Sequence, residues 1–169
     1  MKKAVFSAVG ALVLALGVAL GVAMAADEPE LKEGLWSVHT QTTMNPGNRK
    51  TEGKYTICRN HAFDQSVRLQ GKHQKGCTTA TTSLASGKFS SSTRCLIEGA
   101  KFESTGITTY QGDTATHSES HGIYTPAMNG LGEMTMIMDQ KYLANCPVGT
   151  RPGDRTNADG KVVHLGQAK

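Results

Sequence analysis

The stretch CTTATTSLASGKFSSSTRC, residues 77–95, constrains the fold of this chain most strongly, because it has a cysteine at each end of a hairpin pattern. Its Ser86-Gly87 dipeptide is the only turn signal between the two cysteines, and it lies at their midpoint. Facing residues of an antiparallel strand pair lie close enough for a disulfide. The pattern therefore predicts two short strands joined by a disulfide between Cys77 and Cys95.

The chain has four cysteines, and four cysteines can pair in three ways. The sequence contains no C-x-x-C pair and no Cys/His spacing of the zinc-finger kind, so two disulfides are favoured over a metal site. Once Cys77 and Cys95 are joined, Cys58 pairs with Cys146 by exclusion. A disulfide between Cys58 and Cys77 would instead contradict the predicted register of the hairpin.

The first 25 residues have the three parts of a secretory signal. Lys2 and Lys3 are followed by an apolar and glycine run over residues 9–22, and then by Ala23-Met24-Ala25 as a signal peptidase site. The alternative, a membrane anchor, needs roughly 20 apolar residues with anchoring flanks. No cysteine that could carry a lipid follows Ala25. We expect cleavage near Ala25 and a mature protein without a membrane span, in the periplasm or secreted.

Removal of residues 1–25 leaves 144 residues, a length that suits one domain. The 16 basic and 14 acidic residues that remain are scattered, which does not indicate a nucleic-acid partner. Serine and threonine make up 29 of the 144 residues, so little apolar area is available for a core and the disulfides are expected to compensate. Residues 147–169 are rich in glycine, proline and charge, and predict a flexible tail of little consequence for stability. The folded domain is therefore placed at residues 26–146.

Alternating apolar and polar residues predict a series of strands. Residues 31–44 form the first strand, in which Trp36 and Val38 share a face. Asn45-Pro46-Gly47-Asn48 predicts the turn into a second strand, residues 51–58. Further strands are expected to occupy residues 101–110, 114–124 and 133–142.

One short helix is predicted between the second strand and the cysteine-bounded hairpin. Asn60 can cap a helix that extends to about Leu69, with Phe63 and Val67 four residues apart on one side. Because hairpin follows hairpin, the sequence predicts an all-β fold with this helix: an antiparallel meander of about seven strands that forms an open or closed up-and-down barrel.

A set of short motifs in fixed order resembles a known family. The motifs are Lys32-Glu33-Gly34-Leu35-Trp36, Cys58 before a helix, Gly76-Cys77, Cys95 closing a strand, Tyr110-Gln111-Gly112-Asp113, the Met-Thr-Met run at 134–136, and Asn145-Cys146. With them the chain resembles the domain of unknown function 3617, a family of small exported proteins of Gram-negative bacteria, over most of the mature domain. The resemblance implies no activity.

Met134, Met136 and Met138 recur at the strand period of two and therefore share a face. Thioethers can bind copper, but methionine also fills gaps in a thin β core, and the core interpretation is favoured. Trp36, the only tryptophan, is interpreted as a core anchor rather than a ligand platform. These four residues are the candidates for lining a ligand site or filling the core, and no metal site is predicted.

Catalytic patterns are not found in the sequence. His117 and His121 share a strand face with Glu119, but their spacing separates the imidazoles by roughly 13 Å, which is too far for one metal ion. The sequence has no nucleophile elbow, no H-E-x-x-H motif and no phosphate-binding loop. No catalytic residue and no cofactor are therefore assigned.

Two functions of different classes stay open. The first is a non-catalytic binding module that holds a small apolar molecule or lipid inside the barrel, lined by Trp36 and the methionines. The second is an envelope interaction or stress protein with a filled core and no ligand, which contacts a partner through its outer surface. We expect a monomer in either case. A cavity inside the fold would favour the first function, and a filled core would favour the second.

Overall fold

The computed structural model describes residues 28–165, so the predicted signal segment lies outside the described residues. The described chain forms nine strands and one helix. In chain order these are β1 (Gly34–Asn45), β2 (Arg49–Arg59), α1 (His61–Lys72), β3 (Cys77–Ser83), β4 (Lys88–Ile97), β5 (Ala100–Gln111), β6 (Ala115–Met128), β7 (Leu131–Ala144), β8 (Asp154–Asn157) and β9 (Val162–His164). The fold is mostly β with one short helix, as predicted.

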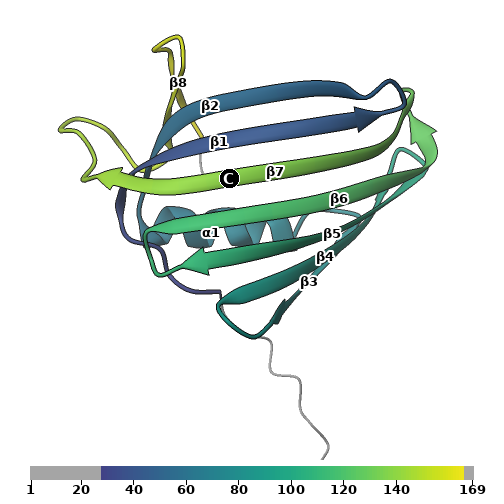
Figure 1. Cartoon of the computed structure of the whole chain (residues 1–169), viewed down its shortest axis with the longest axis horizontal. Coiled ribbons are helices and arrows are strands. Elements are labelled where there is room, and N and C mark those ends of the chain that lie inside the picture. Colours follow the sequence, from purple (N-terminus) through teal and green to yellow (C-terminus); the bar gives the residue numbers. More distant parts are fainter. Residues whose placement is uncertain (1–27, 166–169) are drawn as a thin grey trace, which may run out of the picture.

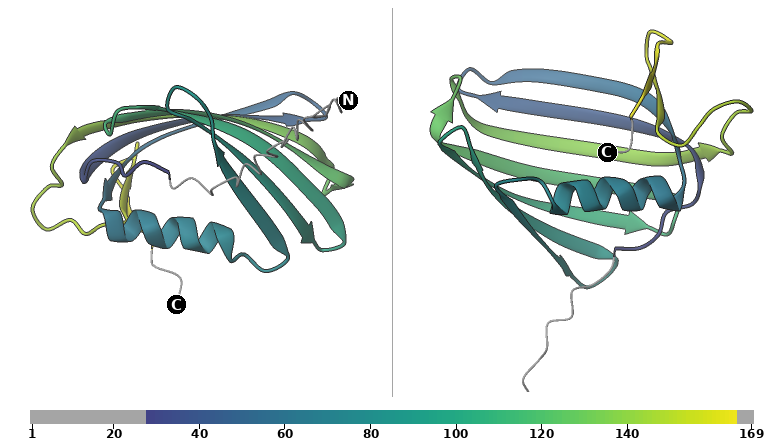
Figure 2. Two further views of the ribbon diagram at one scale, coloured as in Figure 1. Left: turned by 90° about the horizontal axis from the view of Figure 1, so that it is seen from below. Right: turned by 180° about the vertical axis from the view of Figure 1, so that it is seen from behind.

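The nine strands form one sheet in the order β3-β4-β5-β6-β7-β1-β2-β8-β9. Strands β3 to β7 are a meander of hairpins, and β7 then pairs antiparallel with β1. The sheet curves over α1 (Figures 1 and 2). The two edge strands, β3 and β9, do not pair with each other, so the sheet stays open. The open form is thus the correct one of the two predicted barrel forms.

Both predicted disulfides are confirmed. Cys77 faces Cys95 in the β3–β4 register, and the two are bonded. Ser86 and Gly87 form the turn with positive φ angles of 61° and 68°. Cys58 is bonded to Cys146, which joins the end of β2 to the segment after β7. The hairpin symmetry read from the sequence was therefore sufficient to assign both bonds.

The predicted helix is present and begins at the predicted cap. The Asn60 side chain accepts a hydrogen bond from the Phe63 backbone N–H at 2.8 Å. The helix continues to Lys72, beyond the expected end near Leu69, and the His73 backbone N–H donates to the Leu69 carbonyl. Gly71 is therefore tolerated in the last turn, where a helix end frays most easily.

The segment after Cys146 differs from the flexible tail that its composition predicts. Residues 154–157 form β8, which pairs with β2 at Tyr55, Thr56 and Ile57, and residues 162–164 form β9 beside it. The Arg155 guanidinium carbon lies 4.0 Å from the centroid of the Tyr55 ring. Pairing with an exposed sheet edge supplies backbone hydrogen bonds, which need little apolar surface. A low apolar content therefore did not prevent this segment from joining the sheet.

The buried core is small and lies where β1, β2 and α1 meet. Its members are Leu31, Trp36, Val38, Ile57 and Phe63. Trp36 is fully buried, and its Nε1–H donates to the Lys32 carbonyl oxygen at 2.8 Å. The rest of the face of the sheet toward α1 is more open, which leaves room for the site described next.

Candidate functional site

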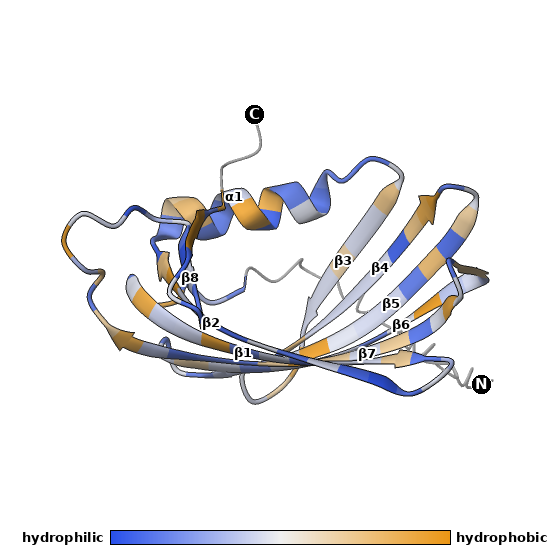
Figure 3. Cartoon of the chain, turned by 90° about the horizontal axis from the view of Figure 1, so that it is seen from above, coloured by the Kyte–Doolittle hydropathy of each residue, from blue (hydrophilic) through white to orange (hydrophobic). Residues whose placement is uncertain are grey.

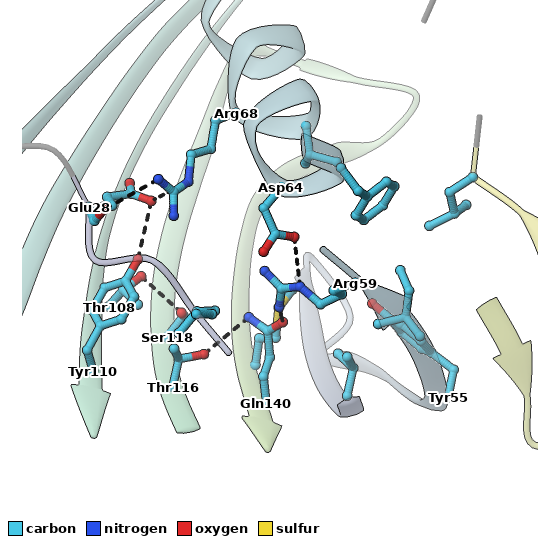
Figure 4. A pocket seen from close by; sticks show the side chains of 17 residues that line it. Glu28, Tyr55, Arg59, Asp64, Arg68, Thr108, Tyr110, Thr116, Ser118 and Gln140 are labelled. Atoms are coloured by element: carbon cyan, nitrogen blue, oxygen red, sulfur yellow. Dashed lines mark hydrogen bonds and ion pairs between the residues drawn. The ribbon is translucent and has the colours of Figure 1, made fainter. Parts of the chain in front are cut away.

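A cavity of about 350 Å³ lies between α1 and the face of the sheet that carries Val38 (Figure 4). We call this face the inner face and the space the inner cavity. Its apolar lining consists of Leu31, Val38, Tyr55, Ile57, Phe63, Val67, Met138 and Leu165. Its polar lining consists of Glu28, Arg59, Asp64, Arg68, Thr108, Tyr110, Thr116, Ser118 and Gln140. The cavity thus has an apolar side toward β1 and β2 and a polar side toward β5 and β6.

The strand register places a row of five side chains on the inner face, where they line the inner cavity. Tyr55 faces Val38, and Val38 faces Gln140 on the next strand. Gln140 faces Thr116, and Thr116 faces Tyr110. Facing residues of an antiparallel sheet project from the same side, so all five reach the cavity from β2, β1, β7, β6 and β5.

Helix α1 supplies the opposite wall. Phe63 and Val67 lie four residues apart, and so do Asp64 and Arg68, which places all four on adjoining rows of one helix face. Phe63 and Asp64 are buried, whereas 49% of Val67 is exposed. The first turn of the helix therefore packs into the core, while its later turns stand off from the sheet.

A buried ion pair joins α1 to the sheet at the cavity wall. Arg59 Nε lies 2.8 Å from Asp64 Oδ1, and the two side chains are only 14% and 8% exposed. Arg59 Nη1 also donates to Gln140 Oε1 at 2.8 Å, and Gln140 Nε2 donates to Thr116 Oγ1 at 3.2 Å. The charges are thus compensated within the wall, as buried charges require.

A second ion pair lines another side of the inner cavity. Arg68 Nε lies 3.5 Å from Glu28 Oε2, and the Tyr110 hydroxyl donates to the same carboxyl at 3.2 Å (Figure 4). Burial, and after it the negative charge of Glu28, raise the pKa of Tyr110 above its ordinary value. Tyr110 therefore stays protonated and acts as a hydrogen-bond donor.

The four residues singled out in the sequence lie on the inner face but have different surroundings. Met138 lines the inner cavity. Trp36 lies in the core, with its ring edge-on to Tyr142 and centroids 6.1 Å apart. Met134 and Met136 face Met44 and Thr42 further along β1 and do not line this cavity. Alternation thus assigned the face correctly, but only Met138 reaches the site.

Most cavity residues were not singled out by the sequence. Arg59, Asp64, Arg68 and Glu28 are ordinary charged residues until the fold brings them together. A usable signal was the pair Asp64 and Arg68, which is four residues apart on the same side as Phe63 and Val67. Charged residues beside the apolar stripe of a short helix indicate that the helix covers a partly polar surface.

The histidines noted in the sequence lie on the outer face of the sheet, away from the cavity. His117 Nδ1 is 2.7 Å from Asp139 Oδ1, and its Nε2 is 3.0 Å from Glu119 Oε1. The hydrogen bond to Asp139, and then that to Glu119, raise the pKa of His117. His121 Nε2 lies 2.6 Å from Glu133 Oε1. His117 and His121 therefore have separate carboxylate partners and do not form one site.

The outer face also carries a groove of about 620 Å³ across β3 to β7, which we call the outer groove. Ile107 and Ile137 are among its lining residues and are 48% and 38% exposed.

Within residues 28–165, no group of three or more His, Cys, Asp and Glu side chains is placed to hold a metal ion. The helix of this range is too short to cross a membrane.

Comparison with known proteins identifies one family. A family model described as "Protein of unknown function (DUF3617)" matches residues 31–146. The match covers α1 and strands β1 to β7, and it ends at the cysteine that closes the longer disulfide. No match was found among the curated proteins.

Proposed function

Since the chain belongs to the DUF3617 family, whose description names no activity, we propose its function from the inner cavity. The protein is an exported, non-catalytic module that binds a small, largely apolar molecule or lipid between α1 and the sheet. The observation that carries this proposal is the cavity itself, because a volume of about 350 Å³ lies within the range of roughly 300–1,000 Å³ that ligand sites occupy.

The position of α1 supports a binding space rather than a filled core. A helix that packs on a sheet normally buries its apolar stripe. Here Phe63 is buried at the start of α1, but 49% of Val67, one turn later, is exposed at the cavity. An apolar ligand would cover Val67 and Met138, and would remove this apolar surface from water.

The polar groups of the cavity are suited to orient a ligand rather than to react with it. Arg59 is held by Asp64 and Gln140. Tyr110 keeps its proton because its pKa is raised. Groups fixed in this way can offer hydrogen bonds and shape to a ligand, and we propose no chemical step for them.

The proposed location is the periplasm, after removal of a signal peptide near Ala25, or the medium. The two disulfides support it, because such bonds persist in oxidising compartments and are rare in the cytosol. N-terminal sequencing of the exported protein should find Ala26 or Asp27 first. Recovery of the intact chain in washed membranes would contradict this part of the proposal.

One observation favours the alternative, an envelope interaction protein that acts through its outer surface. Ile107 and Ile137 are exposed in the outer groove, and exposed apolar side chains in a groove can mark a contact with another protein. On this alternative the inner cavity would hold no specific ligand.

Native mass spectrometry of the protein purified from the periplasm tests the proposal. We expect a bound species that is released by organic solvent, and rebinding of an apolar compound such as 1-octanol to the emptied protein. Fluorescence of Trp36 gives a second readout, because the Arg59 guanidinium carbon lies 5.2 Å from its ring centroid and Arg59 lines the cavity. A ligand-free mass together with no rebinding would favour the outer-surface alternative.

A further inference from the structure

The inner cavity adjoins a second space of about 310 Å³ beneath the C-terminal part of α1. The two spaces share Glu28 and Arg68 in their walls, so the Arg68–Glu28 pair borders both of them. The remaining side chains that line the second space are Lys72, Gln74, Thr79, Thr81, Ser91 and Thr93. None of these described residues is aliphatic or aromatic, and we call the space the polar chamber.

Hydroxyl groups reach the polar chamber from two paired strands. Thr79 faces Thr93, and Thr81 faces Ser91, so the four side chains project from the same side of β3 and β4. The Thr79 and Thr93 hydroxyls lie 3.0 Å apart. Each hydroxyl can donate one hydrogen bond and accept two. The pale colour of β3 in Figure 3 reflects this intermediate polarity, in contrast to the apolar positions on β1 and β2.

The charges around both spaces are arranged in opposite pairs. Arg59 pairs with Asp64 at 2.8 Å and Arg68 with Glu28 at 3.5 Å. Lys72 is the remaining charged residue of the polar chamber, and it is exposed to solvent, where water and salt screen its charge. A ligand that brought its own charge between these pairs would have to give up water, and the one counter-charge outside the pairs would be that of the solvent-screened Lys72. The surroundings therefore favour an uncharged ligand.

We propose that the ligand is an uncharged amphiphile that spans both spaces. Its apolar part lies in the inner cavity, and a head that carries several hydroxyl groups, of the kind found in a glycosyl group, lies in the polar chamber. This inference rests on the proposed function and adds the chemical class of the ligand. The Arg68–Glu28 pair then borders the junction between the two parts of the ligand.

Three octyl compounds test the class of the head group. Binding of octyl glucoside, 1-octanol and octanoate to the full mature protein is measured by NMR chemical shifts, below the concentration at which micelles form. We expect octyl glucoside to bind roughly tenfold more tightly than 1-octanol, through two or more added hydrogen bonds. Its addition should shift amide signals of β3 and β4, and 1-octanol should not. Octanoate should bind most weakly.

Neighbouring threonines on β3 provide a matched pair of variants. Thr81→Val removes a hydroxyl from the polar chamber, whereas Thr82→Val removes one from the opposite face, at the outer groove. Thr81→Val should weaken the binding of octyl glucoside roughly fivefold, which corresponds to the loss of one hydrogen bond. It should leave the binding of 1-octanol unchanged. Thr82→Val should change neither.

The outcomes separate the two proposals. Equal binding of octyl glucoside and 1-octanol in the inner cavity would overturn the inference and leave the proposed function intact. Tighter binding of octanoate than of octyl glucoside would overturn it in favour of an anionic ligand. Failure of all three compounds to bind would instead contradict the proposed function. The comparison of the compounds on the unaltered protein does not depend on the folding of any variant.

Discussion

At the scale of single residues, Arg59 links three parts of the fold that are distant from one another. It comes from the end of β2, pairs with Asp64 of α1, donates to Gln140 of β7 and lies over the Trp36 ring of β1. An arginine can make these contacts together because its planar guanidinium has five N–H donors and a face that stacks on aromatic rings. Arg59 therefore positions the helix relative to the cavity.

Asp64→Asn is expected to destabilise the protein by about 3 kcal/mol, because removal of one partner leaves the buried Arg59 charge uncompensated. Chemical denaturation, followed by circular dichroism, measures the change. Glu103→Gln serves as the control, since its pair with Arg94 is largely exposed, and it should leave the unfolding midpoint nearly unchanged. Equal effects of the two variants would show that the Arg59–Asp64 pair does not hold the helix.

His117 should make stability depend on pH. Its folded-state pKa is raised by Asp139 and Glu119, so its contribution is fully present below the unfolded-state pKa of roughly 6.5. The contribution is then lost as the pH rises through the folded-state pKa. His117→Gln should therefore destabilise the protein at about pH 5.5 and have little effect at about pH 8.5.

Unfolding curves at the two pH values provide the measurement for His117. The double variant Asp139→Asn, Glu119→Gln keeps the imidazole but removes both partners, and it should lose the same pH dependence. A wild-type His117 signal that titrates at or below the ordinary histidine value, followed by NMR, would refute the assignment.

At the scale of elements, helix α1 and the C-terminal hairpin of β8 and β9 build the end of the cavity together. The Gly153 backbone N–H donates to the Cys58 carbonyl at 2.7 Å, and Leu165 lines the inner cavity. Gly153 has a φ of 91°, and a side chain there would collide with the Phe63 ring and the Leu165 carbonyl. Only glycine therefore lets the segment approach α1 so closely.

Truncation after Val148 is expected to destabilise the domain, contrary to the expectation from composition. The truncated protein loses the Arg155–Tyr55 contact and the hydrogen bond to Cys58, which together contribute about 2 kcal/mol. Differential scanning calorimetry of the full and truncated mature chains measures the difference. Removal of residues 166–169 alone is the matched control. An unchanged midpoint after truncation at Val148 would support the flexible tail.

At the scale of the whole molecule, the small core has the same cause as the half-open interior beneath the sheet, namely the polar residues on its inner face. Four of the strands, β3 to β6, turn mainly serine, threonine and glycine toward the inner face in their middle rows, so these rows cannot form a dry core. The apolar side chains are concentrated at β1, β2 and the start of α1. An arch with a half-polar interior results, with one disulfide inside the β3–β4 hairpin and the other joining the end of β2 to the segment after β7.

Filling the inner cavity should abolish binding without loss of the fold. Thr108→Leu places a larger apolar side chain in the cavity, whereas Thr109→Leu adds the same group on the outer face of the same strand. We expect Thr108→Leu to reduce 1-octanol binding at least tenfold and Thr109→Leu to leave it unchanged. Both variants should keep the far-ultraviolet circular dichroism of the parent protein. Undiminished binding by Thr108→Leu would place the ligand elsewhere.

The elements that sequence reasoning predicted well depend on short-range geometry. The hairpin of Cys77 and Cys95 follows from its symmetric spacing, and the Asn60 cap follows from local hydrogen bonding. Where a local signal was overlooked, the prediction erred. Strand β6 continues through Pro126 to Met128, because Asn129 and Gly130, with φ angles of 51° and 79°, form the two-residue turn into β7.

The sequence by itself determined the class of fold, the strand alternation, the helix start and the disulfide pairing, since each depends on residues that are near one another or on a count of cysteines. The tertiary structure alone decided that β7 pairs with β1, that the last hairpin joins the edge of β2, and that Arg59, Asp64, Arg68 and Glu28 meet around a cavity. The physical reason is that contacts between distant segments depend on the summed packing of the whole sheet. The residues next to a charged residue in the sequence do not indicate which distant residue it will contact in the fold.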